Sequence, residues 1–217
     1  MFPSKPRRSS SLSSTISSRA SVGCLSIPCV VSGFLTVLTG VTAGYHRLWA
    51  HRSYNASKPL QYALAMAGAG AVEGSIKWWS RGHRAHHRYT DTGLDPYNAH
   101  QGFWYSHIGW MLLKPRRKPG VADISDLSKN EVVRWQHRWY LTLLLVFGFG
   151  VPTIIPGLLW GDWKGGYIFA GAARLVFVHH VCSLLPHFAR CVELTGLRAV
   201  YLLCQFTRSL VWRDSIR

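Results

Sequence analysis

Acidic residues are scarce in this chain of 217 residues, which has 9 Asp and Glu against 25 Lys and Arg and a formal net charge of +16. This excess of positive charge indicates an anionic partner, for which nucleic acid and a membrane surface are the usual candidates. Long apolar stretches favour the lipid bilayer, because a soluble nucleic-acid-binding module has no use for them. We therefore expect no nucleic-acid partner.

Cysteine is also sparse, and the five Cys residues form no C-x-x-C pair. Their odd number and irregular spacing give no sign of a disulfide framework or a zinc knuckle, so we interpret them as buried reduced thiols. Disorder is excluded for most of the chain, because 48% of its residues are hydrophobic. The exception is residues 1–22, a basic, Ser-rich segment that we predict to be a disordered tail and that also resembles an organelle transit peptide.

Three apolar stretches are long enough to cross a bilayer, since about 20 helical residues span its core of roughly 30 Å. They cover residues 20–45, 139–160 and 167–188. Arg174 interrupts the third, and we expect its side chain to face protein or water, because a charge at mid-membrane is costly. Residues 59–72 are too short to span and predict a buried or interfacial helix. The fold class is thus predicted to be all-α, an integral membrane protein with about three spans.

Topology follows from the basic residues. Residues 46–138 are rich in Lys and Arg, including positions close to the spans, so the positive-inside rule predicts that they face the cytosol. The basic tail at 1–22 favours the same side, although one span separates the two segments. An even number of crossings before residue 46 would resolve this conflict.

Histidine is concentrated in two short strings. H-R-L-W-A-H contains His46 and His51, and H-R-A-H-H contains His83, His86 and His87. On an α-helix the second group shares one face. The first two residues would be about 140° apart on a straight α-helix and would share a centre only at an unwound end. The exit of the first predicted span supplies such an end.

Neutral imidazole is a good ligand for iron, zinc, copper and nickel, so the two strings predict a metal site with histidine ligands only. His100, His107 and His137 are interpreted singly as hydrogen-bonded or surface side chains. Asp91 and Asp95 follow the second string closely. Two interpretations stay open for them: they accept the free ring N–H of a ligand, or they form a capped turn.

Four segments carry a resemblance to a known family. G-Y-H-R-L-W-A-H-R-S-Y (44–54), W-S-R-G-H-R-A-H-H-R-Y-T-D-T (79–92), D-P-Y-N-A-H (95–100) and S-H-I-G-W-M (106–111) resemble the first two histidine boxes and the following loop of membrane acyl-CoA Δ9-desaturases. The likeness is to the stearoyl-CoA desaturase family in its fungal form, and it runs from about residue 44 to about residue 180.

The resemblance implies a helical enzyme of the endoplasmic-reticulum membrane with both boxes facing the cytosol. It further implies a two-iron centre, an acyl-CoA substrate, molecular oxygen and electrons from cytochrome b5, which would act in trans. By this resemblance the iron ligands are His46, His51, His83, His86 and His87, and Arg81 lies near the CoA moiety. Arg81 can equally be one more solvated charge on a basic loop.

The chain departs from the family after His180, where a third box, H-x-x-H-H, is expected and residues 189–217 are unlike the family. We accordingly divide the chain into the tail, a partial desaturase domain at 23–188 and a non-family segment at 189–217, and we expect a chain truncated or frame-shifted at its C terminus. His179 and His180 are interpreted as framework residues. Five imidazoles do not saturate two iron ions, which predicts little or no activity for this chain. A related histidine-box hydroxylase and a non-catalytic, decayed membrane protein remain alternatives.

Overall fold

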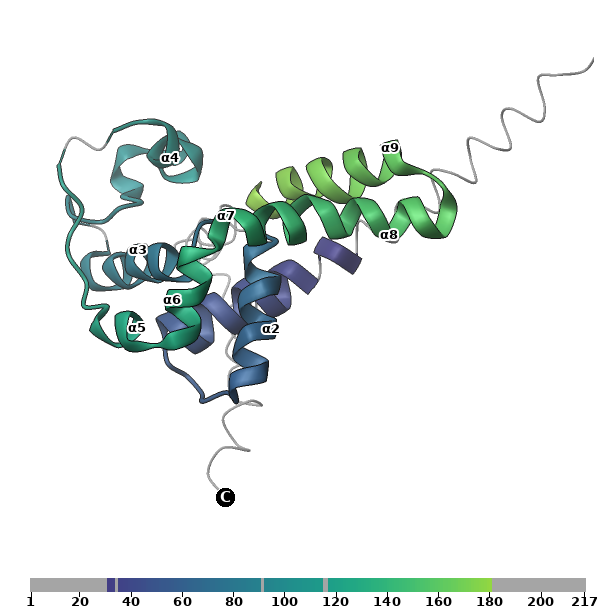
Figure 1. The fold of residues 1–217 in the computed structure, drawn as a ribbon. Coiled ribbons are helices and arrows are strands. Elements are labelled where there is room, and N and C mark those ends of the chain that lie inside the picture. The colour runs from purple at the N-terminus through teal and green to yellow at the C-terminus, as the bar shows by residue number, and fades with distance from the viewer. Residues whose placement is uncertain (1–30, 34, 91, 115–116, 181–217) are drawn as a thin grey trace, which may run out of the picture. The chain divides into compact units, whose positions relative to one another are not determined.

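The computed structural model describes residues 31–33, 35–90, 92–114 and 117–180, and all regular secondary structure in these ranges is helical (Figure 1). This confirms the predicted all-α class for the described part of the chain. Two compact units are present, one formed by Met1–Ser80 with Ile124–Val176 and the other by Arg81–Asp123 with Phe177–Arg217. The predicted tail at 1–22 and the predicted segment at 189–217 lie outside the described residues.

Two long helices, η1 (Leu35–Ala50) and α2 (Lys58–Ala69), pack along each other in the first unit (Figure 1). α2 begins with Pro59 in its first turn, where the missing N–H has no helical partner to lose. A side-chain Cβ on Gly40 would overlap the backbone of Gly68, so the two helices touch through their main chains. α2 is the helix predicted for residues 59–72.

Two short helices, α5 (Ser125–Lys129) and α6 (Glu131–Arg138), complete the core of this unit. The Asn130 side chain caps α6 by accepting hydrogen bonds from the N–H groups of Val132 at 2.9 Å and Val133 at 3.2 Å. The buried core comprises Tyr45, Leu48, Trp49, Leu64, Ala65, Ile76, Leu127, Val132 and Val133. The core therefore joins the end of η1 to α2, α6 and the start of α3 (Ile76–Tyr89).

The 21 residues Tyr140–Trp160 form, among the described residues, the one helix that is long and apolar enough to cross a membrane. It consists of α7 (Tyr140–Leu143), η4 (Leu144–Gly150) and α8 (Val151–Trp160). This helix corresponds to the middle one of the three predicted spans. Residues 20–30, 34 and 181–188 of the other two lie outside the described part of the chain.

A tight turn reverses the chain after α8. Gly161 ends the helix in the left-handed conformation with φ of 71°, which glycine adopts without a Cβ clash. Asp162 then caps α9 (Trp163–Gly165) by accepting the N–H of Gly165 at 2.8 Å. η5 (Gly166–Ala173) runs back beside α8 (Figure 1).

Arg174 follows η5 and is only 1% exposed. Its Nη1 donates to Thr36 Oγ1 at 3.1 Å and to the carbonyl of Gly70 at 3.0 Å, and its Nη2 donates to the carbonyl of Gly148 at 2.8 Å. The guanidinium thus joins η1, the end of α2 and η4. The structure agrees with the prediction that this charge faces protein.

The second unit contains the greater part of α3, which begins in the first unit, together with η2 (Ala99–Gln101), η3 (Tyr105–Gly109) and α4 (Trp110–Leu112). Arg84 Nη1 donates to the carbonyl of Asp123 at 2.8 Å and the N–H of Gly120 donates to the carbonyl of Leu94 at 2.8 Å. The first bond ties Asp123 to α3, and the second joins two parts of the connection between α3 and α5.

Candidate metal centre

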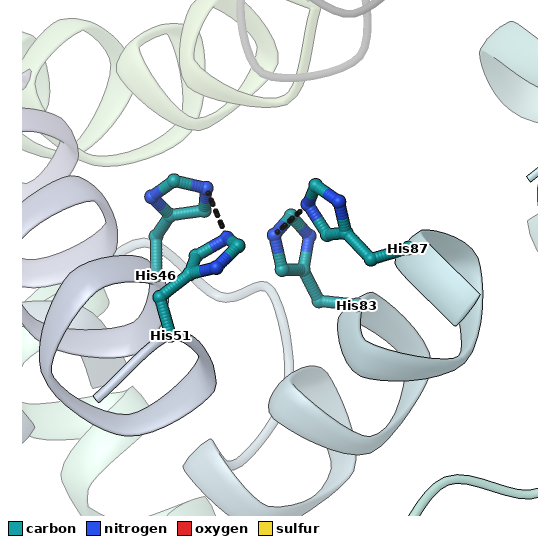
Figure 2. Close-up of side chains that lie close together, drawn as sticks. All are labelled: His46, His51, His83 and His87. Atoms are coloured by element: carbon teal, nitrogen blue, oxygen red, sulfur yellow. Dashed lines mark hydrogen bonds between the residues drawn. The ribbon is translucent and has the colours of Figure 1, made fainter. Parts of the chain in front are cut away.

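His46 and His51 meet at the end of η1, with their Nε2 atoms 3.1 Å apart and their ring centroids 4.4 Å apart (Figure 2). A straight α-helix would point them in different directions. Here the N–H of His51 donates to the carbonyl of His46 at 2.9 Å, a bond over five residues that characterises a π-helix. The wider turn brings the two rings to the same side of the chain.

His83 and His87 lie one turn apart on α3, and their Nε2 atoms are 3.0 Å apart (Figure 2). This is the ordinary i, i+4 neighbourhood of an α-helix. The pair is therefore set by sequence spacing alone, as the sequence predicts.

His86 faces a different partner. Its Nδ1 lies 2.9 Å from Asp95 Oδ1, and its ring packs against Tyr97 with the centroids 5.1 Å apart. An ionised carboxylate only accepts hydrogen bonds, so Nδ1 carries the proton and the lone pair of His86 is on Nε2. Asp95 Oδ1 also accepts the N–H of Tyr97 at 2.9 Å, so this aspartate contacts an imidazole nitrogen and also belongs to a turn. Asp91 lies outside the described residues.

The separation within each pair matches that of two neighbouring ligands on one metal ion. With metal–nitrogen distances of about 2.1 Å, ligands at right angles lie about 3.0 Å apart. Each pair, His46 with His51 and His83 with His87, offers two imidazole donors that could serve a metal ion. The donor set therefore suits iron, zinc, copper or nickel rather than calcium or magnesium, which take oxygen ligands.

Trp79 supports the first pair. Its ring lies 6.3 Å from that of His46 and 5.9 Å from that of Tyr45, in edge-on arrangements. It belongs to the first turn of α3, four residues before His83. Arg81, the predicted CoA-side residue, is an exposed residue of the same helix.

Three further histidines, His137, His107 and His180, have hydrogen-bonding partners outside this group. His137 Nδ1 lies 2.7 Å from Ser75 Oγ, and His107 Nε2 lies 3.1 Å from His180 Nδ1. The ring of His107 is also stacked on Phe103, with an interplanar angle of 11°. The pairing of His107 with His180 could not be found from the sequence, because 73 positions separate them.

A helical protein with two histidine strings that could hold a metal ion is the class that fold and site define. The family model for fatty acid desaturases matches residues 24–213, and the chain belongs to this family.

Three curated relatives show where the chain lies within the family. It is 58% identical over 154 residues to "Probable acyl-CoA desaturase" of Schizosaccharomyces pombe, covering 70% of this chain and 32% of that protein. It is 55% identical over 150 residues to "Acyl-CoA desaturase 1" of Saccharomyces cerevisiae, covering 69% and 29%. It is 45% identical over 162 residues to "Stearoyl-CoA desaturase 5" of Bos taurus, covering 72% and 48%. The chain therefore spans about a third of the length of these fungal relatives.

Proposed function

We propose that the chain acts in acyl-CoA Δ9-desaturation, the oxygen-dependent introduction of a double bond into a saturated fatty acyl-CoA, with the low turnover that five imidazole ligands predict. The names of the fungal and bovine relatives support this substrate class. The observation that carries the proposal is the Nε2 separation of 3.1 Å and 3.0 Å within the two histidine pairs, which suits a metal held by imidazoles.

The same proposal has both histidine strings serve one iron centre. Its support is the continuity of α3, which starts in the first unit, where Trp79 contacts His46. His83 follows Trp79 by four residues and thus lies on the same face of the helix, one turn further on. His86 completes the proposed ligand set through Nε2, the nitrogen that faces away from its bond to Asp95.

Iron, when bound, would activate molecular oxygen to remove hydrogen from an unactivated methylene, chemistry that no side chain provides. The chain's own residues bind the substrate and orient the metal ligands. The Asp95 carboxylate fixes the tautomer and the direction of the His86 ring, and Arg81 attracts the phosphates of CoA. Three exposed cationic side chains beyond α4 add to this attraction for the phosphates: Lys114, Arg117 and Lys118. Cytochrome b5 is the proposed electron donor.

The proposed location is the endoplasmic-reticulum membrane, with three spans in this chain and the histidine strings facing the cytosol. The exposed apolar side chains of the helix Tyr140–Trp160, such as Leu141, Leu145 and Leu158, support its contact with lipid. Tyr140 and Trp160 stand at its two ends, where aromatic side chains favour the membrane–water interface.

The test uses the purified chain in lipid nanodiscs, loaded anaerobically with Fe²⁺. We expect bound iron in the wild type, loss of that iron in the His83→Ala variant and retention in His100→Ala, because His100 lies on exposed η2 outside the group. Stearoyl-CoA, oxygen and reduced cytochrome b5 are then added, and the products are identified by mass spectrometry. A 9-alkene supports the proposal, an alcohol favours a hydroxylase, and a chain without iron or product favours a non-catalytic protein.

A further inference from the structure

Gln136 on α6 has a fully buried side chain, with 0% exposure, that makes two hydrogen bonds in opposite directions. Its Nε2 donates to the hydroxyl of Tyr45 at 2.8 Å, and its Oε1 accepts the N–H of Ile76 at 3.1 Å. A buried amide stays satisfied only while both partners keep their places. The side chain therefore links two points, the Tyr45 hydroxyl and the backbone N–H of Ile76.

Those two points belong to the elements that carry the histidine strings. Tyr45 directly precedes His46 on η1, and its hydroxyl also donates to the carbonyl of Gly74 at 3.1 Å. Ile76 is the first residue of α3, and the N–H groups of a first helical turn have no partner within the helix. Gln136 thus supplies the start of α3 with an acceptor and holds it to the residue beside His46.

Neighbouring bonds secure the same short segment between α2 and α3. The N–H of Gly74 donates to the hydroxyl of Tyr140 at 2.9 Å, and Ser75 Oγ lies 2.7 Å from His137 Nδ1. With the bond from Gln136 to Ile76, three contacts to this segment come from α6 and the beginning of α7. The bond from Tyr45 to Gly74 holds the same segment to η1.

We propose that Gln136 is a positioning residue for the metal centre, setting the start of α3 relative to the end of η1 so that the two histidine strings reach the same ion. The inference rests on the metal centre of the proposed function. Ile76 and His83 are separated by about two turns of a stiff helix, so a shift at Ile76 is carried to the imidazole. Metal geometry tolerates such shifts poorly, because ligand directions decide affinity.

The test compares Co²⁺ binding by the wild-type chain and Gln136→Met in nanodiscs, using the visible absorption of the bound ion. Met has a similar shape but offers neither bond. We expect affinity to fall about tenfold, as for other residues that orient metal ligands, and the absorption bands to change. Gln136→Glu should restore both, because a protonated Glu supplies one donor and one acceptor in the same places.

Asn130→Ala is the matched control. It removes the N-cap of the same helix but touches neither Tyr45 nor Ile76, so it should lower the unfolding temperature while leaving the Co²⁺ spectrum and affinity unchanged. Tyr45→Phe, which loses only the hydroxyl, decides the matter if Gln136→Met does not fold. The inference is overturned if the wild type binds Co²⁺ and these variants bind it equally well, or no more weakly than Asn130→Ala. A wild-type chain that binds no metal overturns the proposed function itself.

Discussion

Three histidines of one string have different surroundings. His83 and His87 face each other, whereas His86 is held by Asp95, whose side chain is 1% exposed. A carboxylate buried to this degree needs a charge-assisted partner, and the Nδ1–H of His86 supplies one. From the sequence alone Asp95 could be a turn residue or a hydrogen-bond acceptor for an imidazole. Its position eight residues after His87 is compatible with both roles.

Asp95→Asn tests the carboxylate without destroying the turn. The Asn side-chain oxygen can still accept the N–H of Tyr97, but it holds the His86 ring more weakly because it carries no charge. We expect iron affinity to fall by about 10- to 100-fold, measured by competition with a chelator. Thr92→Ala, a substitution at the exposed neighbouring turn, should leave it unchanged. Equal iron affinities of the wild type and Asp95→Asn would show that the Asp95 carboxylate does not contribute to metal binding.

Arg174 is the residue on which several helices depend. Arg174→Met leaves the carbonyls of Gly70 and Gly148 without this donor, and each unsatisfied buried acceptor costs about 1–3 kcal/mol. We expect a loss of about 3 kcal/mol or more in the free energy of unfolding, measured by denaturant titration in detergent. Arg138→Met, at an exposed position, provides the control. A loss no larger than that of the control would show that the carbonyls find other partners.

At the scale of elements, helix boundaries follow the sequence closely and helix type does not. Pro59, Asn130 and Gly161 mark the ends of α2, α6 and α8 by chemistry that is visible in the letters. The π-type bond between His51 and His46 has no such signal, because it depends on how η1 packs against α2. The rule of 3.6 residues per turn separates the two rings on a regular helix, and the departure from that geometry at the end of η1 brings them together.

Lys58 on α2 and Glu131 on α6 form an ion pair of 2.7 Å on the surface, with side chains 71% and 60% exposed. Lys58 lowers the pKa of Glu131 below its usual 4.5, and Glu131 raises the pKa of Lys58 above its usual 10.5. The pair therefore adds stability between these two values. That contribution is lost as the pH falls from 4.5 through the lowered pKa, and again as it rises from 10.5 through the raised one.

Glu131→Gln should accordingly be slightly less stable than the wild type at neutral pH and low salt. The difference should vanish in concentrated salt, because exposed charges are screened, and also at acid pH, where Glu131 is protonated. Unfolding midpoints measured across a pH and salt grid check this. A difference that persists in high salt would mean that Glu131 acts through something other than charge.

At the scale of the whole molecule, the sequence predicted the helical class and the histidine strings, and it missed contacts between distant positions. The partners of Arg174 lie up to 138 residues away, and those of His107 and Gln136 are comparably remote. Long-range pairs of this kind depend on packing of whole helices, and no local pattern encodes them.

Orientation across a membrane can be tested at the loop between η1 and α2. Asn55-Ala56-Ser57 is a glycosylation sequon, and Asn55 is exposed, so the loop would be accessible to the luminal enzyme. We expect no glycan when the chain is expressed in eukaryotic cells, because the proposed topology places this loop in the cytosol. The gel mobility before and after glycosidase treatment is the measurement.

Ser57→Ala removes the sequon and provides the control. The Ser57 side chain makes no capping bond to α2, so the substitution should not disturb the helix. If the wild type carries no glycan, the gel mobility of this variant should equal that of the wild type. A glycan on Asn55 would put the histidine strings in the lumen and contradict the proposed topology.

The arrangement around Arg174 also has a consequence for biosynthesis. Thr36, Gly70 and Gly148 all leave the ribosome before Arg174 does. Its positive charge can therefore meet acceptors that are already synthesised, while the reverse order would leave it unpaired in an apolar environment. We therefore expect the described helices to pack in order, with the helix that carries Arg174 packing after η1, α2 and η4.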